Sequence, residues 1–517
     1  MINFKKYFSI VAPIAALIGI VFFIFFNNNN ENVIDDENIG YISNQIIYIL
    51  HADPPELDPT FQNNPMLGRI AIQVWEGLTR IDENRDVVPN LAESYYMLDD
   101  GSWVFNLRQG IFFHDGAYFN ADAVAGSIRR IISPQFSFLD MITYVQVVDD
   151  YTVHITTREP FAALPSHFAH FSTFILSPLA IEAEQLGTPI HYNIAGTGPF
   201  RFDSRIHGEY IDLIRNESYW GGIPYVEKLR FVVIPDPAHR VRMIENRQAN
   251  AVLVQPSDMY NIHFFPHIEA TIKNSDTINF IGFNTARPPF DDVRLRRAIA
   301  MIIDRDDILT VATEGIGIPA TIPIPFGSFG HTQNIEPLPH DPNIATDLIE
   351  QAGLSQGFTT AIHAFGEVSS NVIIAQYLQD VLLKLNIEAD IYLHDIGPFL
   401  NLVTSGQYEG IIIANWTSPT WDADFILNRL FHSNSHGAPG NWTRYTNSYI
   451  DQLLNQARQE RDPEKRIAIY QNISMIIIEE APLITTHYLV YPFLTTGVTG
   501  IEMNNGTLPE FRNARVG

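Results

Sequence analysis

Residues 74–116 read VWEGLTRIDENRDVVPNLAESYYMLDDGSWVFNLRQGIFFHDG. Within this stretch, residues 102–108 alternate polar and apolar side chains, the period-2 pattern of a half-buried strand, and a glycine on either side marks a turn. The apolar residues before Gly77 are expected to form another strand, and residues 120–124 are expected to begin a helix. A pattern of this length is more specific than a short catalytic motif, so it is the main guide to the fold.

Composition places the chain among large soluble proteins. Its 517 residues are enough for about two to four domains. Hydrophobic residues make up 46 %, which supports a large buried core. The formal net charge of −26 argues against nucleic acid as a partner, because the phosphate backbone selects basic surfaces. The chain has no cysteine, which excludes disulfides, cysteine-based zinc sites and a thiol nucleophile.

The N-terminus predicts attachment to a membrane. Lys5 and Lys6 precede residues 7–26, which carry no charge and are nearly all apolar, long enough to span a hydrocarbon core. Basic residues before this segment and acidic ones after it put the body of the protein outside the cytoplasm. A cleaved signal peptide is the alternative, but residues 22–26 offer no small-residue cleavage site, so an uncleaved anchor over residues 1–26 is favoured. Residues 27–43, rich in asparagine and acidic residues, are expected to be a flexible tether.

The ordered motifs resemble a known family. The sequence of EGL, LAES, the Trp-Phe-Leu-Arg strand and FHDG within residues 74–116 closely resembles the signature of the extracytoplasmic solute-binding proteins of ABC transporters, family 5, the oligopeptide, dipeptide and nickel class. Residues 196–200 (GTGPF) and the Phe-Asn and Pro-Phe-Asp motifs of residues 279–294 are similar to further family segments. The resemblance covers about residues 45–488.

This resemblance implies an α/β, two-lobed periplasmic-binding-protein-like fold with an extra domain and a hinged cleft. It implies a discontinuous domain I of residues 44–76, 197–287 and 490–517, a domain II of residues 77–196 and a domain III of residues 288–489. The hinge crossings are expected near residues 283–289 and 488–492. The implied function is that of a receptor that captures a solute, foremost a peptide, and delivers it to ABC permease and ATPase subunits, without catalysis or a cofactor of its own.

Residues 410–436 are the strongest candidate for a ligand site. An apolar strand at residues 411–414 leads into a loop with two tryptophans and two aspartates. Indole rings offer flat apolar walls, and carboxylates hold ammonium groups or sugar hydroxyls. The resemblance also places tryptophan and an acidic residue of this segment in the cleft. The candidate ligand-binding residues are Asn284, Asn415, Trp416, Trp421, Asp422 and Asp424.

The chain departs from the peptide-binding pattern at two positions. Dipeptide- and oligopeptide-binding relatives pair the peptide amino terminus with an aspartate three residues after the tryptophan, where this chain has Pro419. Relatives that bind a free peptide carboxylate use an arginine near the start of the helix after Ala364, but residues 367–376 contain none. A longer peptide held by its backbone, a capped peptide and an oligosaccharide therefore stay open.

Two other classes of function are weighed. His432 and His436, and His167 and His170, have spacings that suit metal ligands, but a third ligand is missing, so no metal site is expected and a receptor for a metal complex remains an alternative. There is no G-x-S-x-G motif and no Walker A motif. The pair of aspartates at 422 and 424 leaves an extracellular hydrolase as the weakest alternative.

Overall fold

The computed structural model describes residues 44–60, 64–132, 139–259, 262–437 and 440–517. The predicted anchor (residues 1–26) and tether (residues 27–43) lie outside these ranges. Within them, no helix is long and apolar enough to cross a membrane.

Helices and strands are mixed along the chain, and they alternate regularly over residues 358–417. The α-helices are α2 (Pro65–Val74), α3 (Ala121–Ile131), α4 (Leu164–His167), α5 (Pro178–Gln185), α6 (Pro237–Glu245), α7 (Val293–Ile302), α8 (Arg305–Thr313), α9 (Pro342–Gln351), α10 (Ser369–Leu382), α11 (Ile396–Ser405), α12 (Ala423–Phe431), α13 (Ser448–Gln459) and α14 (Pro463–Glu480). The short 3-10 helices are η3 (Phe171–Thr173), η4 (Ile190–Tyr192), η5 (Pro256–Met259), η6 (Ile262–Phe264), η7 (Leu383–Leu385) and η8 (Ser433–Ser435).

The strands belong to one large sheet and several small ones. They are β1 (Gln45–Leu50), β2 (Thr79–Ile81), β3 (Val87–Pro89), β4 (Ala92–Met97), β5 (Trp103–Leu107), β6 (Ile142–Asp149), β7 (Thr152–Thr157), β8 (Phe200–Ile206), β9 (Tyr210–Arg215), β10 (Lys228–Val233), β11 (Ala251–Leu253), β12 (Glu269–Phe283), β13 (Ile318–Pro319), β14 (Phe358–Phe365), β15 (Ile387–His394), β16 (Ile411–Thr417), β17 (Leu483–Thr495), β18 (Val498–Thr499), β19 (Glu502–Asn505), β20 (Leu508–Glu510) and β21 (Arg515–Val516). Strands β6 and β7 pair as an antiparallel hairpin.

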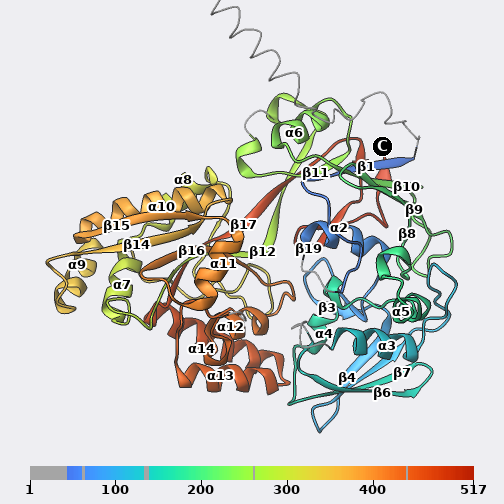
Figure 1. The fold of residues 1–517 in the computed structure, drawn as a ribbon, viewed down its shortest axis with the longest axis horizontal. Coiled ribbons are helices and arrows are strands. Elements are labelled where there is room, and N and C mark those ends of the chain that lie inside the picture. Colours follow the sequence, from blue (N-terminus) through green and yellow to red (C-terminus); the bar gives the residue numbers. More distant parts are fainter. Residues whose placement is uncertain (1–43, 61–63, 133–138, 260–261, 438–439) are drawn as a thin grey trace, which may run out of the picture. The chain divides into compact units, whose positions relative to one another are not determined.

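The large sheet has the strand order β15-β14-β16-β12-β17-β11-β1-β10-β9-β8, and β13 adds to β17 off this path. Strand β1 is parallel to β10 and β11, and β14 is parallel to β15 and β16. Between these two groups lie β12, of 15 residues, and β17, of 13 residues, paired antiparallel. At roughly 3.4 Å per residue each is more than 40 Å long, so the pair runs from one group of strands to the other (Figure 1).

A separate antiparallel sheet, β4-β5-β7-β6, carries the alternating strand expected at residues 102–108. Trp103 and Phe105 of β5 lie in its core, together with the apolar side chains of α3. Asn120 caps α3 by accepting a hydrogen bond from the backbone N–H of Ala123 at 3.1 Å, as the expected helix start requires. The half-buried strand and the following helix are therefore confirmed.

The segment before Gly77 is a helix, not the expected strand. Helix α2 turns Leu67, Ile70 and Val74 toward the core, which is helical spacing rather than alternation. Asn64 caps it by accepting from two backbone N–H groups, and a proline occupies its first turn. Many other helices of the chain also begin after an aspartate or asparagine whose side chain accepts hydrogen bonds from the first backbone N–H groups. Many of these residues therefore have a local structural role.

The buried apolar side chains form separate clusters. One surrounds β1, β10 and α2, a second fills the small antiparallel sheet, and two more surround β14, β16 and helices α7 to α14. Phe280 and Phe283 of β12 pack in the last two clusters, although the sequence assigned residues 197–287 to the first domain. The pairing of β12 with β17 shifts register between Asn274 and Ile278. The domain boundaries and the hinge crossings stay a prediction.

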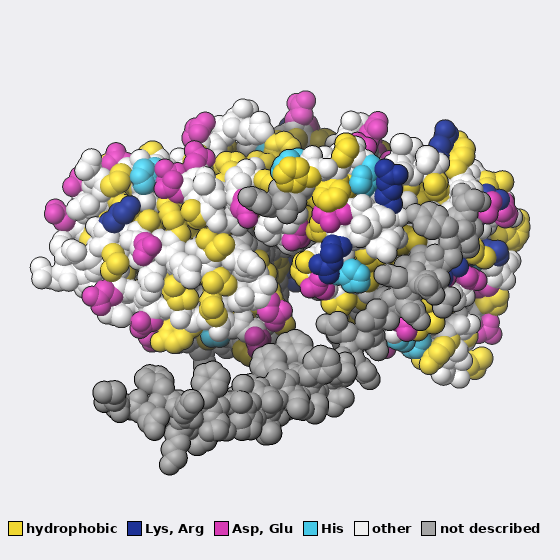
Figure 2. Space-filling model, turned by 90° about the horizontal axis from the view of Figure 1, so that it is seen from above, with side chains coloured by type: hydrophobic (Ala, Val, Ile, Leu, Met, Phe, Trp, Pro, Cys, Tyr) yellow, Lys and Arg dark blue, Asp and Glu magenta, His cyan; other side chains and the backbone are white. Residues whose placement is uncertain are grey.

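Acidic side chains are spread over the face seen in Figure 2, with far fewer lysines and arginines, as the net charge of −26 requires. Charge of one sign over a surface keeps a protein soluble but repels anions at long range.

Candidate ligand-binding cleft

A cavity of about 790 Å³ lies beside the two long strands. Its walls come from the β1 and α2 side of the large sheet, from β12 and β17 themselves, and from α8, α10 and β16. The volume falls within the range of sites that enclose a small ligand, roughly 300–1,000 Å³. Both groups of strands therefore contribute to one space large enough for a short peptide or a sugar.

One wall carries cationic side chains. Arg69 of α2 and Arg240 of α6 line the cavity, and their exposed fractions are 6 % and 8 %. Arg240 Nη1 donates to the carbonyl oxygens of Ile234 and Pro235 at 3.0 and 2.7 Å. Beside them, desolvation and then the charges of the two arginines lower the pKa of His51 to about 4, so this imidazole is neutral at pH 7.

The lining of the cavity also includes an acid. Asp276 lines the cavity at the irregular point of β12, where the pairing with β17 shifts register. Burial raises the pKa of Asp276 to about 6, against the opposing effects of Ser275, Thr277 and the charge of Arg85. A carboxylate that is costly to ionise in this setting is stabilised when a cationic group arrives.

Of the residues predicted from the sequence, Asn415 lies on the cavity wall. It is next to the end of β16, and neither its amide oxygen nor its amide nitrogen has a hydrogen-bond partner in the part of the chain that the structure describes. The adjacent Trp416 packs edge-on against Trp442, with ring centroids 4.9 Å apart. Pro419, where peptide-binding relatives have an aspartate, also lines the cavity.

The two predicted acids have protein partners. Asp422 caps α12 by accepting from the backbone N–H of Asp424 at 2.9 Å, and it forms a buried ion pair with Arg466. Asp424 pairs with Arg458 at 3.0 Å and accepts from Asn428 at 2.9 Å. Neither carboxylate is among the residues that line the cavity, so their predicted contact with a ligand stays a prediction.

Trp421 and Asn284 also hold structural positions. Trp421 is 1 % exposed, and the guanidinium of Arg85 lies 4.4 Å from its ring centroid. Asn284 is fully buried, and its amide donates to the carbonyl oxygens of Gly406 and Tyr408 at 3.2 and 2.7 Å. The structure thus brings Asn415 to the cavity and leaves Asn284, Trp416, Trp421, Asp422 and Asp424 off its lining.

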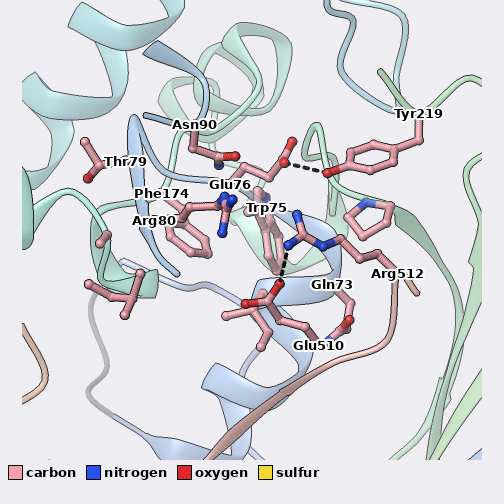
Figure 3. A pocket seen from close by; sticks show the side chains of 14 residues that line it. Gln73, Trp75, Glu76, Thr79, Arg80, Asn90, Phe174, Tyr219, Glu510 and Arg512 are labelled. Carbon is pink, nitrogen blue, oxygen red and sulfur yellow. Dashed lines mark hydrogen bonds and ion pairs between the residues drawn. The ribbon is translucent and has the colours of Figure 1, made fainter. Parts of the chain in front are cut away.

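A second cavity, of about 60 Å³, lies where the sequence motifs meet (Figure 3). The carboxylate of Glu76, from the EGL motif, accepts hydrogen bonds from Thr197 Oγ1 at 2.8 Å, Tyr219 OH at 2.9 Å and Trp220 Nε1 at 2.8 Å. Burial raises the pKa of Glu76, and these donors oppose the shift. The space holds only a few water molecules, so this is a structural junction.

The glycines of the motifs are required at this junction. A Cβ at Gly196 would lie 1.9 Å from the backbone oxygen of Val74, and one at Gly77 would lie 2.1 Å from that of Phe168. His114 of the FHDG motif closes the junction, because its ring lies 2.9 Å from the carbonyl oxygen of Gly198. The signature therefore encodes close backbone crossings rather than ligand contacts.

The two histidine pairs lie in different surroundings, His167 and His170 being buried and His432 and His436 partly exposed. Among the described residues, no group of three or more histidine, aspartate or glutamate side chains could hold a metal ion. Burial lowers the pKa of His170 to about 3. The ring of His432 lies 3.7 Å from the carboxylate of Asp451.

Comparison with known proteins gives a consistent picture. Residues 86–438 match the model of the bacterial extracellular solute-binding proteins, family 5. The glutathione-binding protein GsiB of Salmonella typhi is 30 % identical over 455 residues, which is 86 % of this chain and 88 % of that protein. The structure of HbpA2 from Haemophilus parasuis superposes with a TM-score of 0.82 at 24 % identity, covering 92 % of this chain and all of that one. The periplasmic binding protein DppA from Helicobacter pylori, in complex with the peptide STSA, gives a TM-score of 0.78 at 24 % identity, covering 91 % and 98 %.

Proposed function

The chain belongs to the bacterial extracellular solute-binding proteins of family 5, and we propose that it captures a peptide or a peptide-like solute in the 790 Å³ cavity. Proteins of this family are ABC-transporter receptors that deliver a solute to a permease, and the family is a class of binding proteins rather than of enzymes. The bound solute passes to permease and ATPase subunits, and the chain itself makes no covalent change to it.

The presence of both charges on the cavity walls carries this proposal. A short peptide has a carboxylate and an ammonium group, and the cavity lining offers both Arg69 and Arg240 and the acid Asp276. The unpartnered amide of Asn415 supplies a hydrogen-bonding group between apolar surfaces, which suits a peptide bond. GsiB is named for glutathione, a peptide with free carboxylates, and DppA was solved with a tetrapeptide, which supports the same class.

The proposal also covers which domains form the cleft and how the protein is attached to the membrane. Domain I and domain II form one side of the cleft and domain III the other, with the crossings near residues 283–289 and 488–492, on or next to the two long strands β12 and β17. Residues 1–26 hold the receptor at the outer face of the cell membrane. N-terminal sequencing of the protein isolated from membranes tests this attachment, and a mature chain that begins beyond residue 26 in the soluble fraction would contradict it.

Binding and turnover are measured together. The purified chain is incubated with glutathione, a set of short peptides, oligosaccharides and nickel–histidine, and its melting temperature is followed by differential scanning fluorimetry. Mass spectrometry of the same mixtures detects cleavage. A melting shift with peptides and intact peptides afterwards are expected. A shift confined to sugars or to the nickel complex would replace the peptide class, and cleavage products would replace the receptor by a hydrolase.

A further inference from the structure

Arg69 and Arg240 are a pair of buried guanidinium groups in one wall of the cavity. Arg69 Nε donates to the carbonyl oxygen of Thr507 at 3.3 Å, and Arg240 donates to two backbone carbonyls. The Nε of Arg240 has no hydrogen-bond partner among the described residues. Across the described ranges, neither arginine forms an ion pair with a carboxylate. Their charges are therefore desolvated without being neutralised.

Three other buried or partly buried arginines of the chain are neutralised from within, whereas Arg296, 5 % exposed, has no ion pair among the described residues and donates instead to the backbone carbonyls of Glu480, Phe290 and Asp291. Arg466 holds Asp422, and Arg458 holds Asp424 at 3.0 Å. Arg130 holds Asp58 at 2.6 Å. A buried guanidinium without a counter-ion is unfavourable, so a pair of them facing a cavity indicates that the counter-ion comes from outside the chain.

The electrostatic surroundings support this interpretation. Burial is the largest cause that lowers the pKa of Arg240, the charge of Arg69 adds to it, and Asp258 and Asp236 act in the opposite direction. The net charge of −26 disfavours anions at long range, so any anion in the cavity depends on local cations. An arginine fork offers a carboxylate paired, charge-assisted hydrogen bonds that water in the cavity does not match.

The other walls do not provide a substitute. Helix α10 begins beside Glu367, which lines the cavity, and residues 367–376 contain no arginine or lysine. Asp276 lies on the strand between the two sides of the cleft. A ligand carboxylate is repelled by these acids and attracted to the arginines, whereas a ligand ammonium group behaves in the opposite way.

Building on the proposed receptor function, we propose that Arg69 and Arg240 form a carboxylate-binding subsite, and that the solute is a compound with at least one free carboxylate. The solute lies with its carboxylate against these two arginines and its cationic group toward Asp276. The carboxylate comes from a peptide C-terminus or from an acidic side chain, since both present the same planar group.

Four synthetic peptides and succinate test the subsite on the full-length chain. Ala-Ala-Ala has a terminal carboxylate, Ala-Ala-Ala-amide has none, Ala-Glu-Ala-amide has only a side-chain carboxylate, and Ala-Gln-Ala-amide is its neutral match. Titration calorimetry is expected to show that at least one acid binds at least about 10-fold more tightly than its neutral match. The acid that shows the preference identifies the source of the carboxylate.

Two variants assign the preference to the arginines. Arg69→Met and Arg240→Met are expected to reduce the acid preference to less than about 3-fold, whereas Arg242→Met, on the exposed side of α6, leaves it unchanged. Circular dichroism and the melting temperature without ligand show that each variant is folded. The comparison of acid with amide in the unmodified protein needs no variant at all.

The outcomes separate the subsite from the receptor function. Equal binding of the acids and their neutral matches overturns the subsite and leaves peptide binding intact. If no peptide binds, the peptide function fails, and the subsite is then judged by succinate alone. A melting shift with succinate that both methionine variants remove supports it, and a shift that is absent or unaffected by the variants overturns it.

Discussion

Asp276→Asn should stabilise the ligand-free protein at neutral pH but not in acid. Burial raises the pKa of Asp276 from 3.8 to about 6, so the native state favours the neutral carboxyl group. Its contribution to stability is complete below pH 3.8 and is lost as the pH rises through 6. Each tenfold change in a protonation equilibrium is worth about 1.4 kcal/mol, so ionisation costs the native state at most about 3 kcal/mol at pH 7. Asparagine has the same shape and no charge, so it removes this cost.

The size of the expected effect follows from the length of the protein. Unfolding of a body this long has an entropy of roughly 1 kcal/mol/K, so the variant should melt at most about 3 °C higher than the unmodified protein at pH 7.5. At pH 4 the two proteins should melt within about 1 °C of each other, because the carboxyl group is then mostly protonated. Scanning fluorimetry in low salt, at pH steps between 4 and 7.5, measures the difference. Every other titrating group is common to both proteins and cancels.

A control substitution and a measurement with a bound ligand show whether the effect comes from Asp276. Asp395→Asn removes an exposed carboxylate at the start of α11 that makes no capping hydrogen bond, and it should show no such pH trend. A ligand with an ammonium group should reverse the order at pH 7.5, because it stabilises ionised Asp276 and gains less from asparagine. If the melting difference between Asp276→Asn and the unmodified protein does not grow from pH 4 to pH 7.5, the reasoning about this carboxyl group is wrong.

Three further substitutions probe the scaffold, each by urea denaturation or melting temperature. Glu76→Ala leaves the donors of Thr197, Tyr219 and Trp220 without an acceptor and should lower the free energy of unfolding by about 3–5 kcal/mol. A loss below about 1 kcal/mol would contradict the structural role of Glu76 at the junction. Asp422→Asn leaves Arg466 buried without its counter-ion and should cost about 3 kcal/mol or more, with no effect on peptide affinity. Gly196→Ala should prevent folding or cost more than about 3 kcal/mol. Gly126 lies inside α3, and a Cβ there would meet only Ile181 of α5, at 3.8 Å, so Gly126→Ala should stabilise by up to about 1 kcal/mol.

Parts of the scaffold could be predicted from the sequence because short local patterns, such as alternation and helix caps, indicate its elements. Glycines mark the points where two backbone segments come close. The alternation of residues 102–108 and the cap at Asn120 each predict one element without reference to the rest of the fold. The strand expected before Gly77 was wrong because a short apolar run fits either element, and the cap and proline at residues 64–65 were the signals that distinguished them. The close approach at Gly196 explains why the family motif is so specific.

The site was harder to predict because its charges come from distant segments. Arg69, Arg240 and Asp276 lie on three different elements, and none belongs to a motif. The sequence did contain one signal, the position of Arg69. This arginine lies among apolar residues of α2 that are buried, and a charged side chain is seldom buried without a partner. Asp422 caps α12, the usual role of an aspartate just before a helical run, and its predicted contact with a ligand stays a prediction.

The charges of the cavity also suggest how a ligand couples to the two long strands. The arginines belong to α2 and α6, while Asp276 lies at the register shift between the long strands β12 and β17. A solute that neutralises both walls at once stabilises the conformation that brings them together, and a solute with only one of the two charges does not. A tenfold difference in affinity between conformations is worth about 1.4 kcal/mol, and one charge-assisted hydrogen bond at either wall supplies that much. Arg69, Arg240 and Asp276 therefore determine both the preference for zwitterionic solutes and the stability of the conformation that encloses the ligand.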